Sequence, residues 1–151
     1  MIVEDFIMLG TTVPEPQADG RVFVCSAGYS PEMRRLIRVY PLAMQSAPRM
    51  WSVSRVALEA NPRDSRDESY CLKGNRKGEA HRTINRTFEH VRDVADDEKE
   101  RLISTIESKS KKQANKDRCS LAIVQPDFPP TLHFSENVEA DDHPQMALFA
   151  K

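Results

Sequence analysis

Turn signals divide the first 72 residues of this 151-residue chain into short segments of strand-like composition, and no other feature restricts its fold as strongly. The segments are rich in β-branched and aromatic residues, as is typical of strands, while Pro, Gly, Asn and Asp separate them. Short strands at regular intervals predict a small barrel or a strongly bent antiparallel sheet. The expected strands cover residues 5–13, 21–28, 34–42, 51–59 and 68–72.

The second half of the chain changes to helical periodicity. Apolar residues at positions 84, 88, 91 and 94 predict a helix from about residue 79 to 94. A second helix is expected from Asp96, because acidic residues suit the positive end of the helix dipole. The lysine-rich residues 108–118 are either a continuation of this helix or a mobile loop.

Two further strands are expected at residues 119–124 and 131–134. The chain is therefore predicted to be α+β, with one domain over residues 1–134 that carries a helical insertion at 79–116. The acidic residues 135–151 are expected to form a flexible tail, since they lack apolar periodicity before Gln145.

The composition fits a soluble domain that needs neither disulfides nor a cofactor. No apolar run reaches the roughly 18 to 20 residues of a membrane helix, and the start of the chain lacks a signal peptide. We therefore expect a cytoplasmic protein with no membrane partner. Cys25, Cys71 and Cys119 are far apart and odd in number, which favours buried thiols over a disulfide set or a metal site.

Charge is segregated along the sequence. Residues 34–118 carry 20 of the 22 Lys and Arg but 13 of the 23 Asp and Glu, an excess of seven positive charges. A basic middle between acidic ends is typical of a nucleic-acid-binding surface, although charge blocks also intermix when a chain folds.

Two spans, residues 22–42 and 51–70, resemble bacterial proteins built from OB-like barrels. The shared order is a Cys-containing strand, a Gly turn, an Arg-bearing strand, an aromatic strand and an Asp-x-x-x-Glu-Ser stretch. The resemblance implies binding of single-stranded DNA or RNA, with bases stacked on aromatic rings in a basic groove. The candidate residues are Tyr40, Trp51 and Tyr70 for stacking, and Arg35, Arg38, Arg55, Arg63, Arg66, Lys109, Lys111, Lys112 and Lys116 for phosphates.

Two of these assignments have structural alternatives. Tyr40 and Trp51 are also candidates for the core, which is the commoner place for aromatic side chains. A lysine run with Ser, Gln and Asn is also typical of a solvated loop.

An acidic cluster, Asp64, Asp67 and Glu68, suggests a different function. Together with Lys73 these carboxylates would hold Mg²⁺ in a metal-dependent nuclease. Because Arg63 and Arg66 are interleaved with the acids, a solvated loop with internal ion pairs is the competing interpretation, and an enzyme is the less favoured class.

The C-terminal segment contains Gln145, Met146, Leu148 and Phe149. The sequence motif Gln-x-x-Leu-Phe resembles the peptide by which bacterial replication and repair proteins bind the DNA sliding clamp. In that family Gln forms hydrogen bonds at the rim of a pocket, and Leu and Phe fill an apolar cleft. The alternative is that these apolar residues dock on the body of the protein itself.

Together these features predict a non-catalytic replication or repair accessory, or a phage or mobile-element factor. Its body would bind nucleic acid and its tail the sliding clamp. A protein-interaction module that inhibits a host factor is the other class consistent with a clamp-binding peptide.

Overall fold

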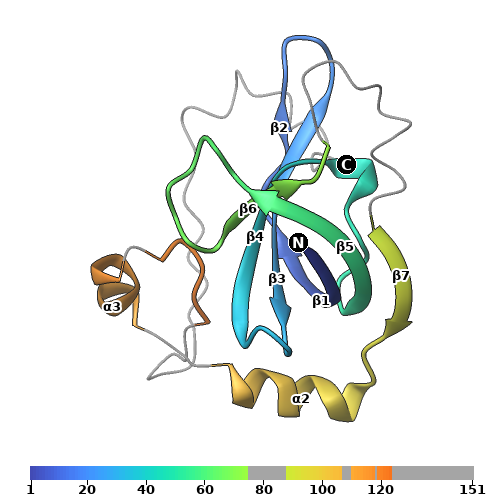
Figure 1. Ribbon diagram of the computed structural model, residues 1–151, viewed down its shortest axis with the longest axis vertical. Helices are drawn as coiled ribbons and strands as arrows, with labels where there is room; N and C mark the ends of the chain where they lie inside the picture. Colours follow the sequence, from blue (N-terminus) through green and yellow to red (C-terminus); the bar gives the residue numbers. More distant parts are fainter. Residues whose placement is uncertain (75–87, 107–109, 118, 124–151) are drawn as a thin grey trace, which may run out of the picture.

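The computed structural model describes residues 1–74, 88–106, 110–117 and 119–123 (Figure 1). Five strands form a closed barrel with the order β1-β3-β4-β6-β5, and β5 pairs again with β1. Neighbouring strands are antiparallel except for β4 and β6, which are parallel. The barrel strands are β1 (Ile2–Thr11), β3 (Val22–Ser30), β4 (Arg35–Ala43), β5 (Ser52–Ala60) and β6 (Ser69–Leu72).

This arrangement is an OB-like barrel, as the sequence predicted. Three short elements extend it. The strand β2 (Glu15–Pro16) pairs with the start of β3, and β7 (Phe88–Asp93) adds to the free side of β5. The 3-10 helix η1 (Met44–Ser46) connects β4 to β5.

The barrel interior is filled by alternate residues of the strands, as the two-residue period of a strand requires. Phe6 is fully buried at its centre, where its ring lies 5.6 Å from the ring of Phe88. Gly28 is required beside this ring, because a Cβ at that position would lie 2.3 Å from the Phe6 side chain. The other buried members include Val3, Met8, Val24, Ile37, Val39, Leu42, Val56, Leu58 and Leu72.

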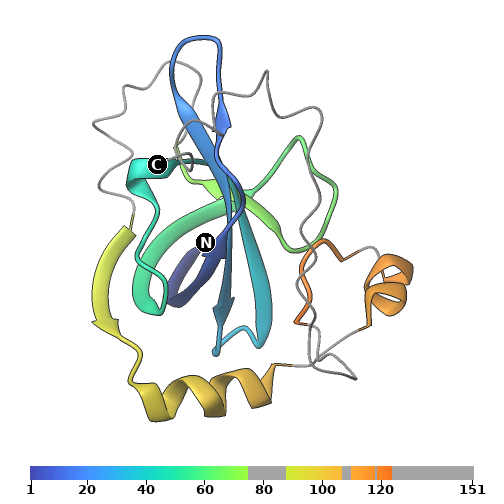
Figure 2. The ribbon, with the colours of Figure 1, turned by 180° about the vertical axis from the view of Figure 1, so that it is seen from behind.

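A second apolar cluster lies outside the barrel. Helix α2 (Asp96–Thr105) runs along one end of the molecule and contributes Leu102, with Ile106 following it (Figure 2). These side chains pack with Ile7, Tyr29 and Val53 from the barrel strands. The helix begins with three acidic residues, as predicted, and none of the helices among the described residues is long and apolar enough to cross a membrane.

The helix predicted over residues 79–94 is wrong for residues 88–93, which form β7, while residues 75–87 lie outside the described part. The spacing of Phe88, Val91 and Val94 fits a helix, but only Phe88 and Val94 turn inward. Val91 is 58% exposed. Pairing with the edge of β5 satisfies the backbone of β7 and overrides the local pattern.

The strand predicted at residues 119–124 is also wrong for residues 119–122, which form no strand. Ile123 forms an isolated β-bridge, and the rest of the segment crosses the outside of the barrel, where Ser120 bonds to Glu68. Cys25 and Cys71 are buried as expected, whereas Cys119 is half-buried. The predicted strand at 131–134 and the tail at 135–151 lie outside the described residues.

Candidate functional site

The outer surface of β3 and β4 is divided into two halves. We call the half near the turn between the two strands, around Tyr29 and Leu36, the lower half, and the half at the other end, around Phe23 and Tyr40, the upper half. In the lower half, α2 and residues 119–123 cover apolar side chains of the second cluster, including Tyr29 and Leu36. Cavities of about 710 Å³ and 440 Å³ lie along residues 119–123, and both are lined by Leu121 and Ala122. In the upper half, Cys25 lines the second cavity together with these residues, whereas Phe23, Arg38 and Tyr40 line neither cavity.

The upper half presents arginine and aromatic side chains. Because Val24 and Val39 point into the barrel, their neighbours Phe23, Cys25, Arg38 and Tyr40 lie on the other side of the strands. Cys25 is buried there, and its Sγ accepts from Arg38 Nε at 2.9 Å. We call these four residues, together with the adjoining loop 61–68, the Arg–aromatic face. The second and third strands of an OB barrel and their flanking loops are the surface on which such barrels bind oligonucleotides.

Each ring on this face lies under a guanidinium group. The Arg21 guanidinium carbon is 5.5 Å from the centre of the Phe23 ring, and that of Arg38 is 5.4 Å from the centre of the Tyr40 ring. Both distances are within the range of cation–π attraction. The Tyr40 hydroxyl donates to Glu15 Oε2 at 3.2 Å, and burial, followed by the Glu15 charge, raises the pKa of Tyr40. Both rings are half-buried, which leaves part of each accessible.

Loop 61–68 borders the face and is held by local hydrogen bonds. Asn61 donates from Nδ2 to the Tyr40 carbonyl at 3.0 Å, and its Oδ1 accepts the Arg63 N–H at 3.1 Å. The Arg38 N–H donates to the Glu68 carbonyl at 2.8 Å, which ties the end of the loop to β4. Asn and Asp side chains favour such turns because they accept from the backbone two residues later.

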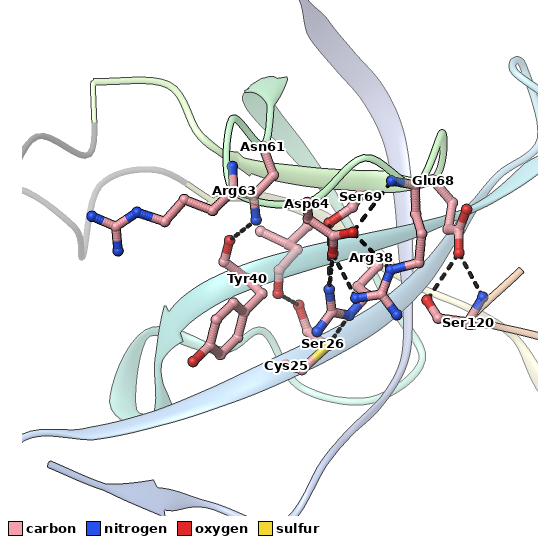
Figure 3. Close-up of polar contacts among 12 residues, drawn as sticks. Cys25, Ser26, Arg38, Tyr40, Asn61, Arg63, Asp64, Glu68, Ser69 and Ser120 are labelled. Atoms are coloured by element: carbon pink, nitrogen blue, oxygen red, sulfur yellow. Dashed lines mark hydrogen bonds and ion pairs between the residues drawn. The ribbon is translucent and has the colours of Figure 1, made fainter. Parts of the chain in front are cut away.

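Asp64 is the centre of this loop's polar network (Figure 3). Its carboxylate accepts from Arg38 Nη1, from Ser69 Oγ at 2.8 Å, and from Arg66 Nε and Nη2 at 2.7 and 2.6 Å. The side chains of Arg38 and Asp64 are only 17% and 13% exposed. Bonds from Arg66, opposed by burial and assisted by Ser69, hold the pKa of Asp64 well below its usual value, so the carboxylate stays ionised at neutral pH.

Glu68 joins the loop to residues 119–123. Its Oε1 accepts from the Ser120 N–H at 2.7 Å and from the Ser120 hydroxyl at 2.9 Å (Figure 3). Burial disfavours the charged carboxylate, but the bonds from Ser120 outweigh it and lower the pKa of Glu68. The segment that covers the lower half is therefore attached to the same loop that borders the upper half.

The structure gathers only some of the predicted nucleic-acid residues on this face. Arg38 and Tyr40 lie on it, and Arg63 and Arg66 lie on its bordering loop. Arg35 donates to the Asp67 carbonyl and lies 5.7 Å above the Tyr70 ring, which packs against the barrel core.

The remaining candidates are elsewhere. Arg55 pairs with Glu4 at 3.0 Å and Glu89 at 3.5 Å, away from β3 and β4. Trp51 packs against the second cluster, as the core alternative predicted. Lys112 and Lys116 are exposed on helix α3 (Lys111–Lys116), the side chain of Lys111 lies outside the description, and Lys109 lies outside the described residues.

The acidic cluster does not form a metal site. Asp64 is bound to two arginines and Glu68 to Ser120, and Asp67 is exposed. In the described part of the chain, no three His, Cys, Asp or Glu side chains are placed to hold a metal ion. The ion-paired loop, rather than the nuclease, is the interpretation that this geometry supports.

Many of the basic residues in the middle region pair with acids of the same region, as in Arg49–Asp93, Arg92–Glu98 and Arg101–Asp97. Arg55 pairs with Glu4 of the acidic N-terminal block.

Comparison with known families assigns most of the chain. Residues 3–119 match a family described as Domain of unknown function (DUF8758). The chain belongs to this family. Comparisons with curated proteins and with solved structures find no match.

The DUF8758 region contains the barrel from Val3 onward, α2 and α3, and so the complete Arg–aromatic face. Ser120 and the clamp-like peptide at residues 145–149 follow it in the sequence.

Sequence reasoning missed Phe23, Arg21 and Glu15 as members of the site. Phe23 and Cys25 are two residues apart in a predicted strand, and the two-residue period of a strand was the available signal that they share one side. Without the neighbouring strand, however, nothing showed that this side faces outward.

Proposed function

We propose that this protein binds single-stranded DNA or RNA on the Arg–aromatic face. The observation that carries the proposal is the combination of an OB-like barrel with two arginine-backed rings, Phe23 and Tyr40, on its second and third strands. Stacking of a base on an aromatic ring is worth about 1 to 3 kcal/mol and is tolerant of sequence. Arg63 is exposed on the bordering loop, and Arg21, which pairs with Asp19, is exposed beside the Phe23 ring. In this proposal both residues contact phosphates.

The arrangement favours a modest dependence on salt. Arg38 and Arg66 are already bonded to Asp64, so few free cations remain for phosphates on this face. Each phosphate contact on a single strand contributes about 0.7 to the salt slope. Stacking is therefore expected to supply a larger share of the affinity than counterion release.

A double variant, Phe23→Ala with Tyr40→Ala, tests this function. Removing two stacking surfaces is expected to weaken binding to oligo-dT or oligo-U by about thirtyfold or more, as measured by fluorescence anisotropy. Val91→Ala on β7 is the control, since it removes an exposed apolar side chain away from the face. Tyr40→Phe keeps the ring and loses the bond to Glu15, so it should bind nearly as wild type.

Two results would contradict the proposal. The first is a wild-type protein with no affinity for either oligonucleotide at low salt. The second is a double variant that remains folded and binds as tightly as Val91→Ala.

We further propose that residues 145–149 bind the bacterial sliding clamp. The support is the Gln-x-x-Leu-Phe spelling near the C-terminus after an acidic, proline-containing stretch. Tethering would raise the local concentration of nucleic acid near the clamp, so two weak contacts would reinforce each other. In this proposal the protein is a non-catalytic accessory of DNA replication or repair, in the cytoplasm where the clamp works.

A further inference from the structure

Asp64 binds two arginines of the Arg–aromatic face, Arg38 on β4 and Arg66 on loop 61–68. Arg66 grips the carboxylate through both Nε and Nη2, at 2.7 and 2.6 Å, and Arg38 binds the same oxygen as Arg66 Nη2. A planar guanidinium fork has the same bidentate geometry toward a carboxylate and toward a phosphate. The Asp64 carboxylate thus occupies the position that an anionic ligand oxygen would take.

The contacts around this carboxylate all come from hydrogen-bond donors. Ser69 Oγ at 2.8 Å and the Arg66 N–H at 3.2 Å complete the set, and Ser69 belongs to β6 beside Arg38 on β4. A site with two guanidinium groups, a hydroxyl and a backbone N–H has the donors that bind one phosphate group. It also lies beside the Tyr40 ring, since Arg38 contacts both.

We propose that Asp64 is an internal competitor for a backbone phosphate of the bound strand. This inference rests on the proposed function. On binding, a phosphate takes over the donors of Arg38, Arg66 and Ser69, and Asp64 turns toward solvent. The exchange replaces one negative group by another, so the arginines stay neutralised throughout and the displaced carboxylate regains its hydration.

The Asp64 carboxylate lowers the affinity of the site for short or isolated phosphates. Ligands that also stack on Phe23 and Tyr40 are therefore bound in preference. Because Asp64 is tethered beside the arginines, it acts at a high effective concentration. A ligand displaces it only with the help of additional contacts, and a single strand of nucleic acid supplies them through its bases.

The loop contains a matched control for this proposal. Asp67 lies three residues from Asp64 and is exposed, and no side-chain bond from Arg38 or Arg66 reaches it among the described contacts. Asp64→Asn and Asp67→Asn each remove one negative charge from the same loop. Only Asp64→Asn removes the anion from the two arginines.

Affinity for oligo-dT is measured for wild type and both variants between low and moderate salt. Asp64→Asn is expected to bind about tenfold more tightly than wild type at low salt, and to steepen the salt slope by about 0.7 to 1.4, for one or two released arginines. Asp67→Asn is expected to gain less than about threefold. Equal gains in the two variants would overturn this inference while leaving the proposed function intact, whereas no binding by any of the three proteins would remove the function itself.

Asp64 also fixes the loop, so the variants are compared only where melting temperatures show that they are folded. If Asp64→Asn does not fold, the proposal is tested by a measurement on the wild-type protein. The side-chain NMR signals of Arg66 Nε–Hε and of the Arg38 Nη protons are expected to shift when oligo-dT is added, because these groups donate to Asp64 and their acceptor changes. Signals that stay in place while the Phe23 and Tyr40 amides shift would overturn the exchange.

Discussion

Gly28→Ala is expected to destabilise the protein by about 3 kcal/mol or more, or to prevent folding. A Cβ at this position would lie 2.3 and 2.4 Å from two ring carbons of Phe6 and 2.8 Å from the Ile7 carbonyl oxygen. The ring cannot retreat, since Phe6 is fully buried and packs on Phe88. Overpacking of a filled core typically costs about 1 to 3 kcal/mol, and here backbone of β1 blocks the remaining space.

Gly10→Ala is the matched control for this substitution. Gly10 is also a strand glycine, but a Cβ there meets no atom within 4 Å, so its stability should change by less than about 1 kcal/mol. Chemical denaturation of both variants provides the comparison. Equal stability of the two would show that Phe6 and β3 are not packed as described.

Leu148→Ala combined with Phe149→Ala is expected to weaken binding to a bacterial sliding clamp by about a hundredfold or more. Each large apolar side chain contributes about 1.5 to 3 kcal/mol when it is buried, and the affinity follows from the sum. Gln145→Ala should have a smaller effect, because it removes hydrogen bonds at the rim of the pocket and little buried area. Titration calorimetry against purified clamp measures all three.

His143→Ala, just before the motif, is the control and should bind as wild type. Thermal melts of the same variants separate clamp binding from docking on the body. An unchanged affinity in the double variant would remove the clamp proposal. A large drop in melting temperature would instead indicate that Leu148 and Phe149 pack on the body of the protein.

The strands of the barrel were predictable because their signals are local. Alternation and turn residues placed β1, β3, β4, β5 and β6 within a few residues of their observed bounds. The sequence predicted a closed barrel only as one of two alternatives, beside a bent open sheet. The reason is that the β1–β5 and β4–β6 pairings join segments that are far apart in the chain. The error at β7 has the same cause, because its strand conformation depends on the edge of β5.

The sequence indicated which types of residue form the candidate site, but not which individual residues belong to it. Arg38 and Tyr40 lie together on one surface, because they alternate along one strand. Tyr70 was selected by residue type alone, and its strand turns it toward the core. Asp64 was grouped with its sequence neighbours as a metal ligand. In the folded protein its carboxylate instead pairs with Arg38, which is 26 residues away in the sequence.

The central claim is that the Arg–aromatic face binds single-stranded nucleic acid, and amide NMR of the ¹⁵N-labelled protein titrated with oligo-dT tests it most directly. The account predicts that the largest shifts fall on Phe23, Cys25, Arg38 and Tyr40 and on loop 61–68. Saturating oligonucleotide that leaves these amides in place, or that shifts only α3 or β7, would contradict it.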